Sequence, residues 1–332
     1  MAQAQATRET FRERIAKRTQ HGDGIFWGLT LSFALLVIVL VFAIVWVTWS
    51  NSQLARERFG WAFFTSGEWN PVETPVNPVS FGAMPAIVGT LVSSAIALIL
   101  AAPVAIGIGI FLAELCPPVL RTPLSFMVEL LAAIPSVIYG VWGVMVFAPF
   151  FTQNVAMPIS QTIGQVVPWL GGDRVSSGRG LLIAGIILSI MILPTIAAIT
   201  RDVLTLVPNS QREVLLALGA TKWEVIWLAV VPYARAGIIG AVMLGLGRAL
   251  GETMAATMLV GNRPQVPETL FEPATTAASL VASELVNAQT LIHESALVLI
   301  ALALFAITLL LNLSARLLIW YMNRGPVGRT RA

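Results

Sequence analysis

The chain has 332 residues, of which 57% are apolar and only 11% charged, with a net charge of +3. Soluble domains carry about 25% charged residues, so this composition excludes an ordinary soluble protein and indicates that lipid surrounds most of the chain. Cys116 is the only cysteine, which excludes an intrachain disulfide. His21 and His293 are far apart in the sequence and form no metal-ligand cluster.

Six apolar runs are long enough to cross a bilayer as helices, which takes about 20 residues. In chain order they are residues 25–49, 83–115, 124–151, 181–200, 225–260 and 292–322. Prolines inside membrane helices are tolerated where neighbouring helices satisfy the backbone, so the runs predict a packed bundle. Gly107 and Gly109 are expected to let two helices approach closely. Kinks are expected at Pro103, Pro135, Pro194 and Pro232.

Lys and Arg residues are distributed unevenly between the two sides of the predicted bundle. With the N-terminus inside, fourteen of the twenty lie on the inner side and five outside, while Arg248 lies in the membrane. Excess positive charge marks the cytoplasmic side, so both termini are expected in the cytoplasm. The predicted parts are a basic segment (1–24), a first span with its outer loop (25–82), a five-span core (83–322) and a basic tail (323–332).

The loop between the fourth and fifth runs, about 201–228, contains a predicted apolar helix on the cytoplasmic side. Ser210, followed three residues later by Glu213, predicts a capping box at its start. Apolar residues follow, and Gly219 then permits a turn into a second helix. An exposed apolar helix of this kind is suited to a groove on another protein.

This loop resembles the EAA loop of ABC-importer permeases, because Glu213, Gly219 and Pro232 keep its spacing. Val214 and Leu215 stand where the family has two alanines, which makes the helix bulkier. The resemblance implies that the helix docks on a separate ATPase and couples ATP hydrolysis to transport. The coupling residues that it implies are Glu213, Leu215, Leu216, Ala217, Gly219 and Ala220.

Longer stretches resemble the membrane subunits of phosphate ABC importers, the PstC and PstA families, and PstC more closely. Among them are "AIPSVIYGVWG" and "GLGRALGETMAATMLVGN". The resemblance implies an all-α type I importer permease with six transmembrane helices, one accessory N-terminal span and a five-helix core. It also implies a PstA-like permease, a PstB-like ATPase dimer and a PstS-like phosphate-binding protein as partners, with membrane lipid around them, in a bacterial inner membrane.

The sequence has no GxxxxGK[ST] phosphate loop, the motif with which many proteins cradle nucleotide phosphates. ATP and magnesium are therefore expected on the partner ATPase, and no cofactor or metal on this chain. The chain is expected not to be an enzyme and not to bind nucleic acid.

Arg248 and Glu252 lie inside the fifth run, where each charge is costly in lipid. On a continuous helix they are one turn apart and share a face, with Arg248 about 20 Å along the helix from Arg235. One interpretation is an ion pair within the helix that lowers the cost of both charges. The other is a path for an anion, because a guanidinium fork suits phosphate oxygens. Glu252 would then accept a hydrogen bond from a protonated phosphate, which sulfate cannot offer.

Further polar groups near this path have weaker predictions. Ser136 and Tyr139 follow Pro135 and either line the path or pack in the core. Thr195 is expected to satisfy a backbone carbonyl that Pro194 leaves free. Glu114 and Glu129, near the cytoplasmic ends of their spans, are expected to be solvated at the membrane interface. Arg201 and Asp202, before the predicted coupling helix, are expected to pair locally.

Three other functions stay open on the sequence. The chain could be a permease for another oxyanion, such as sulfate or molybdate, from the same superfamily. It could be a membrane enzyme for a lipid phosphate, with Arg248 and Glu252 as catalytic groups, although it offers few other acid–base residues. It could also sense phosphate supply or act as a scaffold.

Overall fold

A computed structural model describes residues 23–73, 78–171 and 178–323. Six helices in these ranges are long and apolar enough to cross a membrane, as the sequence predicted: Gly24–Asn51, Met84–Leu115, Ser136–Gln161, Leu181–Thr205, Lys222–Leu250 and Leu291–Tyr321. The third and fifth differ most from their predicted bounds. The chain divides into two compact units between Asn51 and Ser52.

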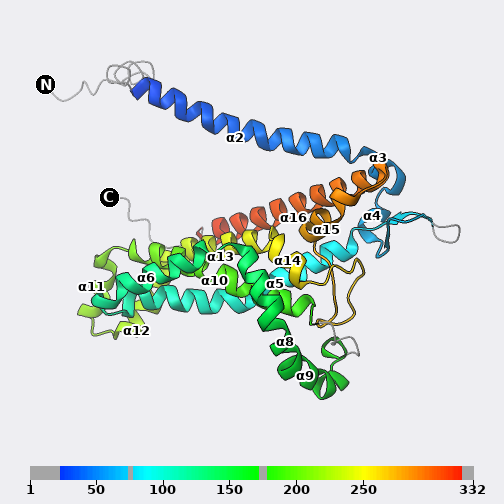
Figure 1. The fold of residues 1–332 in the computed structure, drawn as a ribbon. Helices are drawn as coiled ribbons and strands as arrows, with labels where there is room; N and C mark the ends of the chain where they lie inside the picture. Colours follow the sequence, from blue (N-terminus) through cyan, green and yellow to red (C-terminus); the bar gives the residue numbers. More distant parts are fainter. Residues whose placement is uncertain (1–22, 74–77, 172–177, 324–332) are drawn as a thin grey trace. The chain divides into compact units, whose positions relative to one another are not determined.

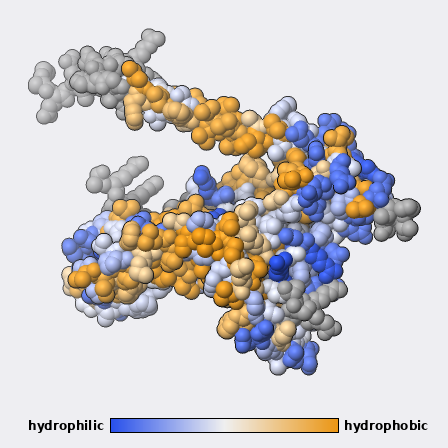
Figure 2. Space-filling view, in the orientation of Figure 1, coloured by the Kyte–Doolittle hydropathy of each residue, from blue (hydrophilic) through white to orange (hydrophobic). Residues whose placement is uncertain are grey.

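The first unit contributes one long helix, α2 (Asp23–Asn51) (Figure 1). From Gly24 onward it has no Asp, Glu, Lys or Arg. Its large apolar side chains are exposed in every turn, and Figure 2 shows them along the visible face of the helix. A helix that is apolar all round is suited to lipid or to other membrane helices.

The second unit is helical apart from one short hairpin. Its first half contains α3 (Gln53–Phe59), α4 (Ala62–Thr65), β1 (Trp69–Asn70) paired antiparallel with β2 (Ser80–Phe81), α5 (Met84–Ile110), the π-helical turn η1 (Phe111–Leu115), α6 (Pro118–Ala133), α7 (Ser136–Trp142), η2 (Gly143–Phe147), α8 (Ala148–Phe151), η3 (Thr152–Ala156), α9 (Met157–Gln161), η4 (Ile163–Gln165) and η5 (Pro168–Leu170). Its second half contains α10 (Leu181–Thr205), α11 (Asn209–Ala217), α12 (Lys222–Val225), the π-helical turn η7 (Ile226–Val230), α13 (Val231–Leu250), α14 (Met254–Leu259), α15 (Ala277–Glu284), η8 (Leu285–Asn287) and α16 (Leu291–Asn323).

The centre of this unit is α10, against which α5 and α13 both pack (Figure 1). Small residues allow the close approach of α5, because a Cβ atom on Gly109 would lie 2.7 Å from the Thr200 side chain. The prediction for Gly109 is therefore confirmed. The prediction for Gly107 is wrong, since a Cβ atom there would meet nothing within 4 Å.

The four prolines expected to cause kinks have different surroundings. Helices α5 and α10 continue through Pro103 and Pro194, whereas Pro135 separates α6 from α7. Ile134 is extended there (ψ 128°), as is usual for a residue before proline. Pro232 is the second residue of α13, directly after the π-helical turn η7.

The break at Pro135 also explains why the predicted third span is misplaced. The predicted run, 124–151, combined the second half of α6 with α7 and α8. The span in the structure begins at Ser136 and reaches Gln161. Helix α6 has no fully buried residue. Most of its large apolar side chains are exposed, while Val128 packs against the core.

A compact cluster anchors the hairpin at the end of the unit opposite α11 and α12. Trp69 donates its indole N–H to Oε2 of Glu284 at 2.8 Å, and His293 Nε2 lies 2.9 Å from the same oxygen. The Phe81 ring stacks on the His293 ring, with centroids 5.2 Å apart. These contacts hold β1 and β2 against α15 and α16. Hydrophilic residues gather at this end in Figure 2.

Candidate functional site

The fifth span is interrupted between the two charged residues that the sequence placed on one helix face. Helix α13 ends at Leu250 and α14 begins at Met254. Arg248 therefore lies in the last turn of α13, and Glu252 lies in the break. The prediction of a continuous helix through both residues is wrong.

Local hydrogen bonds explain why the helix stops there. Gly251 has a low helix preference and leaves the helical conformation at φ −89° and ψ 0°. The Thr253 hydroxyl donates to the Gly251 carbonyl at 3.3 Å, and Glu252 Oε1 accepts from the N–H of Ala255 at 3.2 Å. Such side-chain-to-backbone bonds compete with helical ones. The Glu252 carboxylate is thereby held at the start of α14.

Arg248 has a neutral partner instead of Glu252. Its Nη1 donates to the Thr195 hydroxyl at 2.9 Å, and no salt bridge joins it to Glu252 in the part of the chain that the structure describes. Both charged side chains are half-buried. The interpretation as an intrahelical ion pair is therefore wrong. A guanidinium has five N–H donors, and the bond to Thr195 uses one of them.

Thr195 follows Pro194 on α10 and was expected to satisfy a freed backbone carbonyl. It instead accepts the hydrogen bond from Arg248, so that expectation is wrong. The contact joins α10 to the last turn of α13, and these helices pack side by side. Residue spacing gave no signal for it, because the two residues are 53 positions apart.

Tyr139 is buried, and its hydroxyl is engaged across the break at Pro135. That hydroxyl donates to the Leu131 carbonyl at 3.0 Å, which joins α6 to α7. Ser136 is half-buried at the first position of α7. Of the polar groups predicted near the path, the structure thus brings Thr195 into contact with Arg248.

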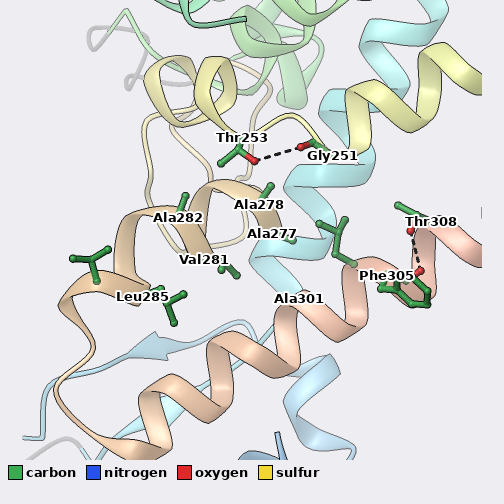
Figure 3. Close-up of a pocket in the computed structure, with 12 residues that line it drawn as sticks. Gly251, Thr253, Ala277, Ala278, Val281, Ala282, Leu285, Ala301, Phe305 and Thr308 are labelled. Carbon is green, nitrogen blue, oxygen red and sulfur yellow. Dashed lines mark hydrogen bonds between the residues drawn. The ribbon is translucent and has the colours of Figure 1, made fainter. Parts of the chain in front are cut away.

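An apolar pocket of about 610 Å³ borders the helix break, and Arg248 does not line it (Figure 3). Gly251 and Thr253 line one edge, and the rest comes from α15, η8 and α16. Its two hydroxyls, on Thr253 and Thr308, both donate to backbone carbonyls. The pocket is therefore poorly suited to an anion, and the polar site is the side of the break with Arg248.

The loop with the predicted coupling residues forms two short helices joined by a tight turn. Helix α11 is capped by Pro208 without a side-chain hydrogen bond, so the predicted capping box at Ser210 and Glu213 is wrong. The capping box of this loop lies at Thr221 and Glu224, which start α12. Gly219, between the helices, has φ +85°.

The six predicted coupling residues divide into two groups. Leu215 and Ala220 pack against a buried cluster around Leu204 and Ile226. The other four are exposed: Glu213, Leu216, Ala217 and Gly219. These four exposed residues form a surface on α11 and its following turn that a docking partner could contact.

Charged groups near α11 are paired more extensively than the sequence predicted. Arg201 contacts Asp202 at 2.6 Å and Glu129 at 2.9 Å, which confirms local pairing of Arg201 with Asp202. Glu114 was expected to be solvated, and this is wrong because it forms a salt bridge with Arg212 at 2.6 Å.

Comparison with known proteins agrees with this architecture. Residues 105–325 match the family described as binding-protein-dependent transport system inner membrane component. The match covers most of the membrane helices and the α11–α12 loop. A chain of the MetNI methionine ABC transporter, in an inward-facing conformation, has the same fold with a TM-score of 0.50 at 16% identity, over 73% of this chain and 95% of that chain. Fold and loop thus define a multi-pass permease of the ABC-importer class, and the predicted all-α type I fold is confirmed.

Curated relatives extend the match over nearly the full length. The phosphate transport system permease protein PstC of Mesorhizobium japonicum is 44% identical over 92% of both chains. The PstC of Pasteurella multocida is 43% identical over 90% of this chain and 92% of its own. PstC 1 of Mycobacterium tuberculosis is 40% identical over 81% and 85%. The chain belongs to the PstC family of ABC-importer permeases.

Proposed function

We propose that this chain is the permease subunit of an ATP-driven importer of inorganic phosphate. The observation that carries the proposal is the half-buried guanidinium of Arg248, whose bond to Thr195 leaves most of its donors available. A cation in the outer half of a membrane helix is costly without an anion or water beside it. The PstC relatives, at 40–44% identity, are named for phosphate transport, which supports phosphate as the anion.

Arg248 and Glu252 would bind different parts of the same ion. The guanidinium fork donates to phosphate oxygens. The Glu252 carboxylate accepts a hydrogen bond from the P–OH group that phosphate keeps near neutral pH. Sulfate has no such proton, so the same carboxylate repels it. Because Glu252 is oriented by the Ala255 N–H, its position does not depend on an ion pair with Arg248.

The partners follow from the same assignment. A PstA-like permease would complete the path, and a PstS-like protein would deliver phosphate from outside. A PstB-like ATPase dimer would bind ATP and magnesium, with none on this chain. The exposed side chains Glu213, Leu216 and Ala217 of α11 would contact that ATPase. The distribution of Lys and Arg supports α11 and both termini on the cytoplasmic side of an inner membrane.

The proposal is tested by uptake of radioactive phosphate into proteoliposomes that contain the complete complex. Arg248→Gln removes the charge, and the expected result is loss of uptake with normal assembly of the subunits. Arg316→Gln, which alters an exposed arginine of α16, serves as the matched control and keeps uptake. A tenfold excess of sulfate should leave phosphate uptake unchanged.

Three results would contradict the proposal. Normal uptake by the Arg248→Gln complex would remove Arg248 from the path. Strong competition by sulfate or molybdate would assign the chain to a different oxyanion. Turnover of a lipid phosphate by the purified chain without an ATPase would favour the enzyme interpretation instead.

A further inference from the structure

Arg212, on the proposed coupling helix α11, is bound to the membrane helices by an extensive set of hydrogen bonds. Its Nε and Nη2 donate to the two carboxylate oxygens of Glu114 at 3.2 and 2.6 Å. The same guanidinium donates to the carbonyls of Leu204, at 3.0 Å, and Val207. Asn209 Oδ1 accepts a further bond at 3.2 Å. All three guanidinium nitrogens are therefore engaged.

The pair is shielded from solvent. The side chain of Arg212 is 18% exposed and that of Glu114 is 11% exposed. Replacing a buried ion pair by apolar residues is often neutral or stabilising, so stability alone is a weak reason for it. A bidentate Arg–carboxylate interaction does fix the relative orientation and distance of its two side chains. The pair is therefore suited to transmitting a displacement.

The pair connects elements that are distant in sequence. Helix α11 has no buried residue and packs mainly on its neighbours α12 and η7. Arg212, by contrast, reaches Glu114, 98 positions earlier, in the π-helical turn η1 that ends α5. It also reaches Leu204 in the last turn of α10. Helices α5 and α10 pack along each other, so Arg212 holds α11 to the centre of the unit.

The same helix α10 carries the partner of the candidate anion site. Thr195 accepts from Arg248 and lies nine residues before Leu204, which is about 14 Å along a helix. A displacement of α11 that moves the end of α10 therefore also acts on the residue that orients Arg248.

We propose that Arg212 and Glu114 form a coupling latch, through which motion of α11 reaches α5 and α10. Arg212 is a positioning residue in this scheme and touches neither phosphate nor ATP. The inference rests on the proposed transport function, because it needs an ATPase that moves α11. Without the latch, ATP hydrolysis continues and α11 moves without carrying the membrane helices along.

The test measures phosphate transported per ATP hydrolysed in proteoliposomes with the complete complex. Arg212→Gln should lower this ratio about 5- to 150-fold, the usual range for coupling between two sites. Because that variant leaves the Glu114 carboxylate buried and unpaired, the double variant Arg212→Gln with Glu114→Gln is made as well. The double variant should assemble normally, hydrolyse ATP and show the same low ratio.

Arg121→Gln is the matched control. Arg121 donates from α6 to the Leu112 carbonyl in the same turn η1 at 2.8 Å, but it does not belong to α11. Its substitution should leave the ratio of transport to hydrolysis unchanged. An equal fall in the Arg121→Gln complex would assign the effect to η1 in general and overturn the latch.

Two further outcomes would overturn the proposal. One is an unchanged ratio in both the single and the double variant. The other is failure of the charge-free double variant to assemble, which would make the pair a folding element only. If the wild-type complex transports another anion, the proposed phosphate function fails, but the ratio can be measured with that anion. The two failures are therefore distinguishable.

Discussion

Replacement of Gly219 by valine tests whether the turn after α11 must keep its shape for coupling. The turn is closed by two hydrogen bonds, from the Gly219 N–H to the Leu216 carbonyl and from the Ala220 N–H to the Leu215 carbonyl, both 3.0 Å long. This is the Schellman pattern, and it includes the expected apolar contact because Leu215 and Ala220 pack on the same buried cluster. The pattern requires a left-handed residue, and Gly219 has φ +85°.

The expected effect comes from backbone conformation alone. A Cβ atom on Gly219 would meet nothing within 4 Å, so the substitution creates no clash. The left-handed conformation costs a residue with a Cβ atom about 1–2 kcal/mol. A cost of that size changes the ratio of the closed turn to open forms by a factor of about 5–30. Valine should therefore displace α11 in a large fraction of molecules.

The assay is again phosphate transported per ATP hydrolysed by the reconstituted complex. Gly219→Val should lower the ratio about 5- to 30-fold, while the subunits still copurify. Gly219→Asn is the control, because asparagine tolerates the left-handed conformation, and it should keep most of the coupling. Wild-type coupling in the valine variant would refute the argument that the turn positions α11 for its partner.

Two further predictions concern polar contacts that the structure adds. Thr195→Val removes the acceptor of the Arg248 bond, and a hydrogen bond to a charged group contributes about 1.5–3 kcal/mol. Phosphate uptake below saturation should therefore fall about tenfold or more in this variant, whereas Thr195→Ser should retain uptake. Equal uptake in both variants would contradict a role for the hydroxyl. Trp69→Phe removes the indole bond to Glu284 and should lower the free energy of unfolding by about 2 kcal/mol, which is measured as a lower thermal unfolding temperature of the purified complex. Trp61→Phe, at an 87% exposed position, is the control and should change the free energy of unfolding by about 0.5 kcal/mol or less. Equal stability of the two variants would contradict the anchoring role.

Hydropathy predicted the number of spans because crossing a bilayer demands a long apolar helix whatever the tertiary packing. It failed where an apolar run contains a break. Residues 245–260 are apolar enough to continue the fifth span, and the signal for its end is only Gly251 followed by two residues with polar side chains. At the third span the signal was stronger, because Pro135 disfavours helix at Ile134 and separates α6 from α7.

The contacts of the candidate site were harder to predict than its residues. Arg248 was identifiable because an arginine in an apolar run is costly. Its partner Thr195 was not, since they are 53 residues apart and join only when α10 packs on α13. The salt bridge between Arg212 and Glu114 spans 98 residues and has no local pattern. Such contacts depend on tertiary packing, which a single sequence does not specify.

The break in the fifth span changes what Arg248 and Glu252 can do in the proposed transporter. On one continuous helix their separation would be nearly fixed. In the structure Arg248 belongs to α13, which continues from the coupling loop. Glu252 lies in the break and is bound to Ala255 of α14, a helix that packs closely on α7. A shift of α13 relative to α14 therefore changes the distance between the two charges. A site whose affinity differs between two states can bind the ion in one state and release it in the other. This adjustable pair is therefore better suited to transport than a fixed one.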